Sequence, residues 1–388
     1  MRIGLMVGRE ETFPKAFIER VNALGKVDVT AEFVVLGGTR LDEECPYDVI
    51  IDRISHEVPY YRTYLKQAAL AGTRIINNPF RCAADDKHFG FALASRIGIA
   101  IPRTALLPNK DYCEGIVPES LRNLAYPIDW QGIVDYVGLP AFLKPAHGGG
   151  WKNVNKIETL DELLYHYDQS GQLTMTLQQA VNFDQYVRCW CIGREEVIIA
   201  QYDVKQRRYL PAEGYLEPAM EKRIIADTLT INRALGYDMN TVEFAIENGV
   251  PYAIDFTNTA PDMEFWSITD IYFDRVVDAM IRLALRLGEE GRTKMDHLSM
   301  GAMTGEGKLV AKPVAPKAAA PTPLAAVTVA PAKPAVATAP LPTAAPAAAA
   351  AIVKPVAKSA EPVAGTPAPT PAPVVKSVEL PKAKKTKK

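Results

Sequence analysis

Apolar residues near the start of the chain occur either in short continuous runs or at helical spacing. Ile3 to Val7 is a short apolar run that ends at Gly8, which predicts a buried strand. In residues 16–24 the apolar side chains recur at the spacing of an amphipathic helix. The same criteria predict further strands at 27–36, 47–51 and 73–76 and a second helix at 60–71. Because strands alternate with helices, we expect a small α/β domain with a parallel sheet at residues 1–80.

The pattern that follows predicts a larger region of mixed helices and strands at residues 81–300. Helices are expected at 85–97, 130–136, 160–167, 220–235 and 270–287, and strands at 141–145, 174–178, 186–192 and 196–202. Two further strands, Met239 to Glu247 and Val250 to Phe256, are separated only by Asn248-Gly249. This dipeptide is the strongest short-range signal for a β-hairpin.

The last part of the chain, residues 301–388, has a different composition. It consists mainly of Ala, Pro, Val and Lys and contains no aromatic residue. Such a segment has too little apolar bulk to compensate for the entropy of ordering, so we expect a disordered tail. Residues 302–388 contain 12 Lys and 3 Glu, a net charge of +9, which leaves -10 for the rest of a chain of formal charge -1. The lysine-rich end could contact an acidic partner, but the simpler interpretation, a solubilising tail without a partner, is favoured.

Cysteine usage and hydropathy predict a soluble, cytoplasmic protein. The five cysteines are odd in number and lack metal-ligand spacing, which is typical of reduced thiols in the cytoplasm. No apolar run approaches the roughly 18 residues that a membrane span requires. The chain begins directly with a strand pattern instead of a signal peptide.

Lys144 and the glycines after it are the first candidate for a phosphate site. The chain has neither a Gly-x-x-x-x-Gly-Lys-Ser/Thr loop nor a Gly-x-Gly-x-x-Gly turn after its first strand, so any nucleotide site must be of another kind. Lys144 lies near the end of a predicted strand, and Gly148 to Gly150 follow shortly after. A lysine supplies a point charge for phosphate, and glycines let backbone N–H groups approach phosphate oxygens. A tight turn with a surface lysine is the alternative interpretation.

The predicted hairpin carries a candidate magnesium site. Glu243 lies on its first strand, Asp255 on its second and Asn258 just beyond, and such oxygen ligands suit Mg²⁺. The two carboxylates alternate with apolar neighbours, which indicates half-buried strands. A buried carboxylate without a partner is unfavourable, so the pattern favours a bound cation over a solvated surface.

Taken in order, these segments resemble the ATP-grasp superfamily, which includes D-alanine:D-alanine ligase, glutathione synthetase and ligases that add glutamate to proteins. The resemblance covers about residues 45–290 and rests on segments 47–53, 75–79, 86–87, 98–104, 138–150, 177–181, 186–188 and 253–258. It implies an α/β (α+β) ATP-grasp fold with an N-terminal Rossmann-like domain, and ATP and Mg²⁺ as cofactors.

The resemblance also implies a set of nucleotide-binding residues. Lys87 and Lys144 correspond to the lysines that contact the phosphates, and Gly148, Gly149, Gly150 and Trp151 to the flexible loop over the triphosphate. Gln178, Gln179 and Val181 correspond to the hinge segment that binds adenine, where the family usually has a Glu, and Gln185 falls near the ribose position. Glu243, Asp255 and Asn258 correspond to the metal ligands. The family typically has Glu followed by Asn two residues later, whereas here Asn follows Asp at three.

Candidate catalytic and substrate residues come from two other loops. Lys205, Arg207 and Arg208 form a basic segment, and basic residues in the corresponding family region often stabilise the transferring phosphoryl group. Arg207 and Arg208 are therefore the catalytic candidates, with a solvated loop as the alternative. The substrate candidates Arg53, Ser55 and His56 follow a predicted parallel strand at its carboxyl end, where open α/β sheets bind ligands. His147, beside the glycines, is either catalytic or an ordinary loop residue.

The resemblance predicts an ATP-dependent ligase that activates a small-molecule or peptide carboxylate as an acyl phosphate for attack by an amine. Two other outcomes stay open at this stage. One is a small-molecule kinase, because inositol polyphosphate kinases share this fold. The other is a non-catalytic ATP-binding scaffold whose tail makes the interactions.

Overall fold

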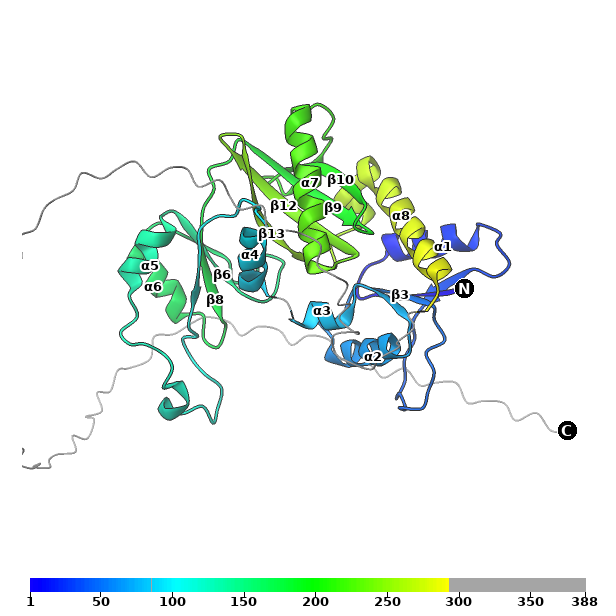
Figure 1. Cartoon of the computed structure of the whole chain (residues 1–388), viewed down its shortest axis with the longest axis horizontal. Helices are drawn as coiled ribbons and strands as arrows, with labels where there is room; N and C mark the ends of the chain where they lie inside the picture. The colour runs from blue at the N-terminus through cyan, green and yellow to red at the C-terminus, as the bar shows by residue number, and fades with distance from the viewer. Residues whose placement is uncertain (85, 293–388) are drawn as a thin grey trace, which may run out of the picture. The chain divides into compact units, whose positions relative to one another are not determined.

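The computed structural model describes residues 1–84 and 86–292 (Figure 1). The chain divides into two units, Met1–Ala319 and Ala320–Lys388, and every residue described below belongs to the first. The predicted disordered tail, residues 301–388, lies outside the described residues.

The N-terminal part forms a parallel sheet covered by helices on both faces. Its strands are β1 (Arg2–Met6), β2 (Thr30–Phe33), β3 (Val49–Asp52) and β4 (Arg74–Ile76), in the order β2-β1-β3-β4. All neighbouring strands pair in parallel, which confirms the prediction of a parallel sheet. Helix α1 (Thr12–Asn22) packs Phe13 and Phe17 against Ile3 and Leu5, and α2 (Pro59–Leu70) packs Leu65 against the opposite face.

A second, four-stranded sheet is antiparallel and has the order β5-β8-β6-β7. Its strands are β5 (Thr104–Leu107), β6 (Ala141–Pro145), β7 (Asn155–Ile157) and β8 (Met175–Gln179). Helices α5 (Trp130–Val137) and α6 (Leu160–Asp168) cover it through a core that includes Val137, Leu143, Leu163 and Leu177. The short strand β7 and the 3-10 helix η1 (Pro118–Leu121) were not expected from the sequence.

A third, five-stranded antiparallel sheet has the order β11-β10-β9-β12-β13. Its strands are β9 (Gln185–Ile192), β10 (Glu196–Asp203), β11 (Arg208–Leu210), β12 (Met239–Glu247) and β13 (Val250–Asn258). Asn248 and Gly249, with φ of 51° and 75°, form the predicted hairpin turn between β12 and β13. The left-handed backbone at both positions explains the Asn-Gly dipeptide. Helices α7 (Pro218–Leu235) and α8 (Phe265–Glu290) pack against this sheet through separate cores.

One helix lies where the sequence predicted a helix at 85–97, and a short helix that was not predicted precedes it. The short helix is α3 (Pro79–Ala84), and the predicted helix is α4 (Lys87–Arg96). The carboxylate of Asp86 accepts a hydrogen bond from the backbone N–H of Phe89 at 2.7 Å and caps α4. This cap makes Lys87 the first residue of the helix, so the expected start was too early by two positions.

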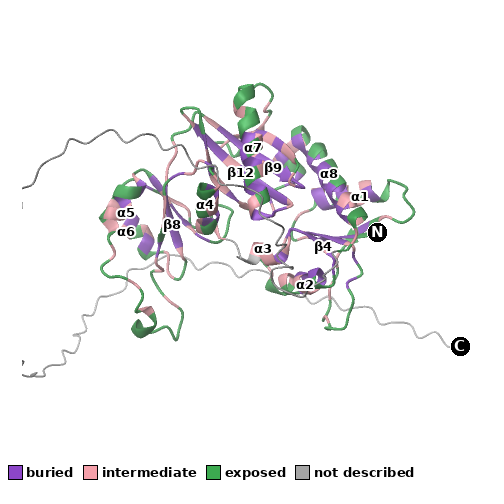
Figure 2. Ribbon diagram, viewed as in Figure 1, coloured by how far each residue is buried: buried purple, intermediate pink, exposed green. Residues whose placement is uncertain are grey.

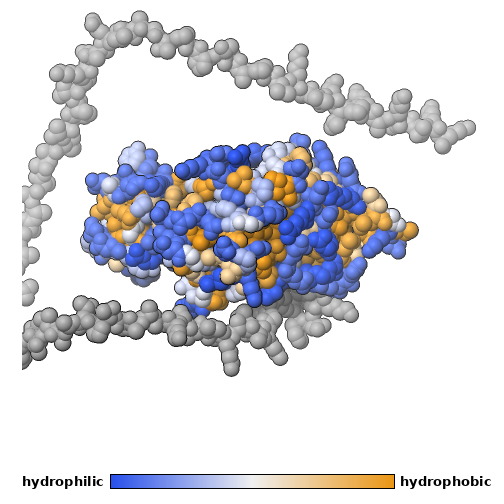
Figure 3. Space-filling model, turned by 90° about the horizontal axis from the view of Figure 1, so that it is seen from above, coloured by the Kyte–Doolittle hydropathy of each residue, from blue (hydrophilic) through white to orange (hydrophobic). Residues whose placement is uncertain are grey.

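The burial pattern follows from these layers. Buried residues concentrate on the sides of helices and strands that face one another (Figure 2). The face shown in Figure 3 is largely hydrophilic, with several separate apolar areas. Within residues 1–84 and 86–292, no helix is both long enough and apolar enough to cross a membrane.

Asn77, which follows β4, fixes the N-terminal sheet to both ends of the β12–β13 hairpin. Its Oδ1 accepts hydrogen bonds from the backbone N–H groups of Asp238 and Met239 at 2.6 and 2.8 Å. Its Nδ2 donates to the carbonyl oxygens of Met239 at 2.6 Å and Thr259 at 3.3 Å. The side chain is therefore buried with all four of its hydrogen-bonding positions used.

A side chain at the start of each of the helices α1 and α8 caps the N-terminus of the other. The Glu264 carboxylate accepts hydrogen bonds from the backbone N–H groups of Glu11 and Thr12 at 3.1 Å and of Phe13 at 3.4 Å. In return, the hydroxyl of Thr12 accepts from the backbone N–H of Phe265 at 2.8 Å. The N-terminal N–H groups of a helix have no partners within the helix, so these contacts satisfy groups at both helix starts.

Candidate functional site

Lys87 and Asp255 form a partly buried ion pair between α4 and the five-stranded sheet. The Lys87 ammonium group lies 2.7 Å from both carboxylate oxygens of Asp255 on β13. Lys87 reaches this strand because the Asp86 cap fixes the start of α4 beside it. The sequence predicted a phosphate-binding role for Lys87 and a metal-binding role for Asp255, and the structure brings the two residues together.

Lys144 connects the two antiparallel sheets. It lies on β6, and its Nζ donates to Oε1 of Gln178 on β8 at 2.8 Å and to the carbonyl oxygen of Ile254 on β13 at 3.1 Å. The ammonium group also lies 5.1 Å from the centre of the Phe91 ring. Lys144 is 8% exposed, so it is not the surface lysine of the alternative interpretation, and its partner Gln178 is 4% exposed.

The two lysines and Asp255 adjust one another's protonation. Burial lowers the pKa of Lys144 to about 8, an effect that the Lys87 charge strengthens and Asp255 and Glu243 oppose. Burial would raise the pKa of the Asp255 carboxyl, but the neighbouring Lys87 and Lys144 ammonium groups outweigh it and lower that pKa to about 2. Asp255 is therefore an anion throughout the neutral range.

Glu243 lies directly opposite Asp255 on the paired strands β12 and β13. One Glu243 oxygen lies 3.0 Å from the Arg188 guanidinium, and the other accepts a hydrogen bond from the Tyr186 hydroxyl. Burial, followed by the Glu243 charge, raises the pKa of Tyr186 well above its usual value, so this phenol stays a donor.

Asn258, the third predicted metal ligand, lies at the exposed end of β13 opposite Thr241. Its backbone N–H donates to Oδ1 of Asn240 at 3.0 Å. Across the described part of the chain, no group of three or more His, Cys, Asp or Glu side chains is arranged to hold a metal ion. The structure therefore brings Glu243 and Asp255 together and places Asn258 farther along the hairpin.

The glycine-rich loop after β6 is exposed. Gly148 and Gly150 have φ of 103° and 68°, and a Cβ added at either residue would meet no atom within 4 Å. These glycines are therefore required by backbone conformation and not by crowding. Trp151, at φ 61°, is 51% exposed, and the neighbouring His147 is exposed as well.

The predicted adenine and ribose residues lie on or between β8 and β9. Gln179 accepts a hydrogen bond at its Oε1 from Nε of Arg103 at 3.3 Å. Gln185 donates from Nε2 to the carbonyl oxygen of Tyr215, and Val181 is half-buried in the connection between the strands. Gln179, Val181 and Gln185 thus follow Gln178 in the sequence, and Gln178 accepts a hydrogen bond from Lys144.

Arg207 lies in a tight turn and Arg208 begins β11, so the basic loop is shorter than the sequence suggested. The carboxylate of Asp203 forms the turn by accepting the backbone N–H groups of Lys205 and Gln206, each at 2.9 Å. Arg207 has φ 53°, and its guanidinium carbon lies 5.9 Å from the centre of a Trp151 ring. Two loops far apart in the sequence therefore meet, whereas Arg208 is exposed on the adjoining strand.

A pocket of about 230 Å³ lies where these loops meet. It is lined by Trp151, Tyr186, Arg188, Tyr202, Val204 and Arg207. Arg188, Tyr186 and Tyr202 were not among the predicted site residues. The available signal was the alternation along β9, which places Tyr186 and Arg188 on one face of the sheet.

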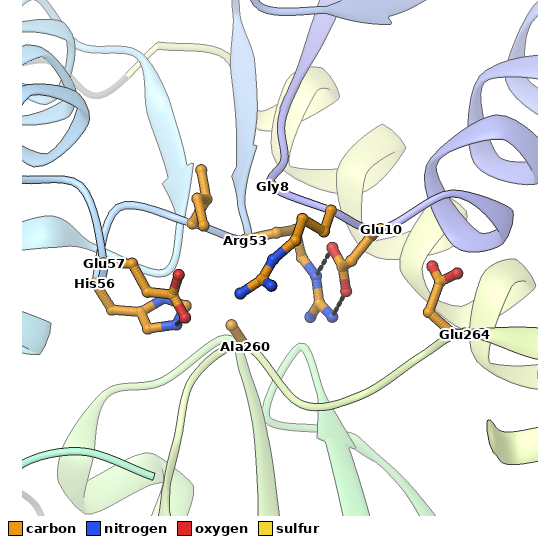
Figure 4. A pocket seen from close by; sticks show the side chains of 9 residues that line it. Gly8, Glu10, Arg53, His56, Glu57, Ala260 and Glu264 are labelled. Carbon is orange, nitrogen blue, oxygen red and sulfur yellow. Dashed lines mark hydrogen bonds and ion pairs between the residues drawn. The ribbon is translucent and has the colours of Figure 1, made fainter. Parts of the chain in front are cut away.

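A second pocket, of about 270 Å³, lies at the carboxyl ends of β1 and β3 (Figure 4). The residues that line it are Gly8, Arg9, Glu10, Arg53, Ile54, His56, Glu57, Ala260 and Glu264. Figure 4 shows His56 and Glu57 on one side of the pocket, and the Arg53–Glu10 pair and Glu264 on the other.

The structure separates the three predicted substrate residues. Arg53 is 4% exposed and pairs with Glu10, with its Nε at 3.0 Å from a carboxylate oxygen, and it also donates to the carbonyl oxygen of Pro261. Ser55 is buried and donates to the carboxylate of Asp52. His56 lines the pocket and is exposed, whereas Arg53 and Ser55 are buried.

Comparison with known sequences finds short matches. No protein-family model matches the chain. A D-alanine–D-alanine ligase from Psychrobacter sp. (strain PRwf-1) is 34% identical over 110 residues, which are 28% of this chain and 29% of that enzyme. Pyruvate carboxylase 1 from Caenorhabditis elegans is 26% identical over 186 residues, 43% of this chain and 15% of that enzyme. The matched segments thus span less than a third of either relative.

Comparison with solved structures gives longer matches. A RimK domain ATP-grasp protein from Sphaerobacter thermophilus DSM 20745 has a TM-score of 0.53 at 17% identity, covering 74% of this chain and 100% of that one. VanG D-Ala:D-Ser ligase from Enterococcus faecalis has a TM-score of 0.52 at 16% identity, with coverage of 74% and 98%. A D-alanine–D-alanine ligase from Bacillus anthracis has a TM-score of 0.50 at 18% identity, with coverage of 75% and 100%.

Proposed function

From its ATP-grasp fold, we propose that the protein is a member of the ATP-grasp superfamily and an ATP- and Mg²⁺-dependent ligase that joins a carboxylate to an amine. One observation carries the proposal. Lys87 and Lys144, from two different elements, converge with Asp255 at the junction of two antiparallel sheets. Two positive charges beside an anionic strand suit a phosphate chain together with a metal ion.

In this proposal the nucleotide lies between β6, β8 and β13. Lys87 and Lys144 bind its phosphates, and the loop Gly148, Gly149, Gly150 and Trp151 covers them. Gln178, Gln179 and Val181 hold the base, and Gln185 holds the ribose. The hydrogen bond between Lys144 and Gln178 supports this arrangement, because it joins a proposed phosphate residue to the proposed base segment.

The donor set of the hairpin fits Mg²⁺. Glu243 and Asp255 offer carboxylate oxygens on neighbouring strands, and Asn258 offers an amide oxygen farther along. Mg²⁺ commonly takes one or two protein carboxylates and completes its coordination with phosphate and water. When bound, such an ion neutralises negative charge on a transferring phosphoryl group.

The reaction has two balanced steps. A carboxylate oxygen of the acid attacks the γ-phosphorus of ATP, the bond from that phosphorus to the β,γ-bridging oxygen breaks, and ADP leaves with an acyl phosphate remaining. The amine nitrogen then attacks the carbonyl carbon, the carbon–oxygen bond to phosphate breaks, and the amine loses a proton. Arg207 supplies positive charge near the transferring group. The structure does not bring Arg208, the other catalytic candidate, into the pocket that Arg207 lines.

We assign the amine to the pocket of Figure 4. It lies at the carboxyl ends of parallel strands and is closed on one side by Ala260 and Glu264, which follow the proposed metal strand. The Glu57 carboxylate would attract the amine in its ammonium form and accept the proton that the amine must lose before it attacks, and His56 lies beside Glu57. Arg53 shapes the wall through its pair with Glu10, whereas Ser55 is buried against Asp52 outside the pocket. A cytoplasmic location and an acidic partner for the basic tail stay predictions.

Hydroxylamine trapping tests the proposal. With ATP, Mg²⁺ and pooled carboxylic acids, a ligase converts hydroxylamine to a hydroxamate and releases ADP and phosphate. A kinase would instead leave a stable phosphorylated product and release no phosphate. That product would overturn the ligase proposal, and nucleotide binding without any turnover would indicate a scaffold.

A further inference from the structure

The pocket between the glycine-rich loop and the β10–β11 turn combines three aromatic side chains with two guanidinium groups. Trp151, Tyr186 and Tyr202 supply the rings, and Arg188 and Arg207 the charges. We propose that this pocket receives the acid substrate and that the acid carries its carboxylate on an aromatic ring. The inference rests on the proposed ligase function and specifies the acid that the ligase uses.

The charges around the pocket fit a monoanion. The guanidinium of Arg188 lies 3.0 Å from Glu243, so this pair contributes no net charge. Among the residues that the structure describes, Arg207 forms no ion pair with a carboxylate. One positive charge is therefore left for a ligand. A triphosphate carries more negative charge than one guanidinium offsets. Lys144, held by neutral acceptors, and Lys87, paired with Asp255, both lie outside this pocket.

The walls fit a flat ligand. The guanidinium carbon of Arg188 lies 3.7 Å from the centre of the Tyr202 ring, and the Tyr186 and Tyr202 ring centres are 6.1 Å apart. The Trp151 ring is half-exposed, with Arg207 near it. Aromatic rings favour stacked or edge-on contact with another ring, and a guanidinium plane both stacks on a ring and binds a carboxylate.

The backbone at the rim is strained on both sides. Trp151 and Arg207 have φ of 61° and 53°, the left-handed region that bulky side chains rarely adopt. Strain of this kind concentrates at functional sites, where the surrounding structure maintains it. Here it directs two side chains from distant loops to the same pocket.

The position of the pocket fits the proposed chemistry. Two of its residues, Tyr186 and Arg188, contact Glu243, which faces Asp255 on the next strand. An acid held by Arg207 would thus bind beside the proposed metal and phosphate groups. Arg207 would then offset the repulsion between the carboxylate and the phosphoryl group that it attacks.

Calorimetric titration of the full chain in Mg²⁺ and ADP tests the pocket with three probes of similar size. We expect benzoate to bind, and cyclohexanecarboxylate, which keeps the charge but not the flat ring, to bind about tenfold more weakly. Benzyl alcohol, which keeps the ring but not the charge, should also bind at least about tenfold more weakly.

Two exposed positions allow variants that keep the fold, and each has a matched control. Arg207→Met should remove the preference for benzoate over benzyl alcohol, whereas Arg122→Met, at an exposed arginine just after η1, should not. Trp151→Leu should remove the preference for benzoate over cyclohexanecarboxylate, whereas Trp266→Leu, at a tryptophan that is 63% exposed on α8, should not.

Equal affinity for benzoate and cyclohexanecarboxylate would overturn the aromatic specificity. Equal affinity for benzoate and benzyl alcohol, or no binding of benzoate, would overturn the acid site. These titrations measure binding and need no turnover. They therefore test the pocket independently of the hydroxylamine experiment, which tests the ligase function. Benzoate binding that depends on Arg207 and Trp151, without hydroxamate formation, would keep the pocket and reject the ligase. Hydroxamate formation only from acids without rings would keep the ligase function and reject the aromatic acid pocket.

Discussion

At Lys144, burial and charge act against each other. The ammonium group is held by one side-chain oxygen and one backbone oxygen from different sheets, while burial favours its neutral form. In the proposed site a phosphate oxygen would supply the anionic partner that these two neutral acceptors do not.

Replacing Lys144 by Met should therefore abolish nucleotide binding or lower turnover by about 100-fold, the effect of removing one charge-stabilising donor. The fold should survive because methionine fills a similar volume. Nucleotide affinity measured by calorimetry, with a melting curve as control, checks this. Unchanged affinity in a folded variant would exclude Lys144 from the site.

The lowered pKa of Lys144 predicts a pH dependence. Because its pKa is about 8 in the folded protein, the ammonium group loses its proton as pH rises through that value, and affinity for Mg·ATP should fall. Lys144→Arg should keep its charge and remove this fall, because guanidinium does not deprotonate in this range. Titrations between pH 6.5 and about 9.5 test both proteins. A wild-type affinity independent of pH would contradict the prediction.

The Lys144 ammonium group should also make the free energy of unfolding depend on pH. The folded pKa of about 8 lies below the unfolded value of about 10.4, so the unfolded chain binds more protons between the two. The contribution of Lys144 to the free energy of unfolding should therefore rise with pH across this window. Urea denaturation at several pH values gives the free energy of unfolding against pH. The difference between the slopes of this plot for the wild type and for Lys144→Arg measures the contribution.

Asp255→Asn should raise the Mg²⁺ concentration needed for half-maximal activity by at least about tenfold, because the substitution removes an anionic ligand. It also removes the partner of Lys87. Magnesium titration of turnover checks the result, with Asp161→Asn, at an exposed position of α6, as the control. A titration curve like that of the wild type would place the metal elsewhere.

Several site residues could be predicted from the sequence because strand patterns and the ATP-grasp resemblance located them. Lys87, Lys144, Gln178 and Asp255 lie together as the resemblance implied, although their roles stay predictions. The sequence could not show that Arg53 is buried in an ion pair, because its partner Glu10 lies 43 positions earlier and approaches only in the folded sheet. Arg188 was not predicted as a site residue for a similar reason, because its role depends on cross-strand neighbours.

At the scale of elements, the longer segments were located, although the predicted starts of α1 and α8 were late by four and five residues, and several short segments were missed. The predicted bounds of β6 and β12 match the structure, and those of α6 and α7 agree within two residues. The short strands β7 and β11 pair only with β6 and β10, and three residues carry no usable period. Tertiary pairing, and not local pattern, therefore defines these elements.

The reciprocal capping of α1 and α8 predicts a stability effect. Glu264→Gln removes the charge that faces three backbone N–H groups, and it should lower the free energy of unfolding by about 1 kcal/mol. Urea denaturation measures the change. The control is Glu11→Gln at the N-cap residue of α1, whose side chain makes no capping hydrogen bond. Equal effects in both variants would contradict a capping role for Glu264.

At the scale of the whole molecule, the described residues form four buried clusters. These clusters, one against each face of the N-terminal sheet and others beside the two antiparallel sheets, consist of residues before 292. A chain that ends near residue 300 should therefore keep its melting temperature and its nucleotide affinity. Scanning calorimetry of both lengths checks this, and a large fall in melting temperature would give the tail a structural role.

The contacts of Asn77 have a consequence for how this protein can diverge. Three of its four partners are backbone groups at the start of β12 and the fourth is a carbonyl just after β13, so the junction recognises main chain and no side chain. Substitutions at Asp238, Met239 or Thr259 leave these hydrogen bonds available. The hairpin can therefore accumulate new side chains, and with them new specificities, while the four hydrogen bonds that Asn77 makes to its main chain are inherited unchanged.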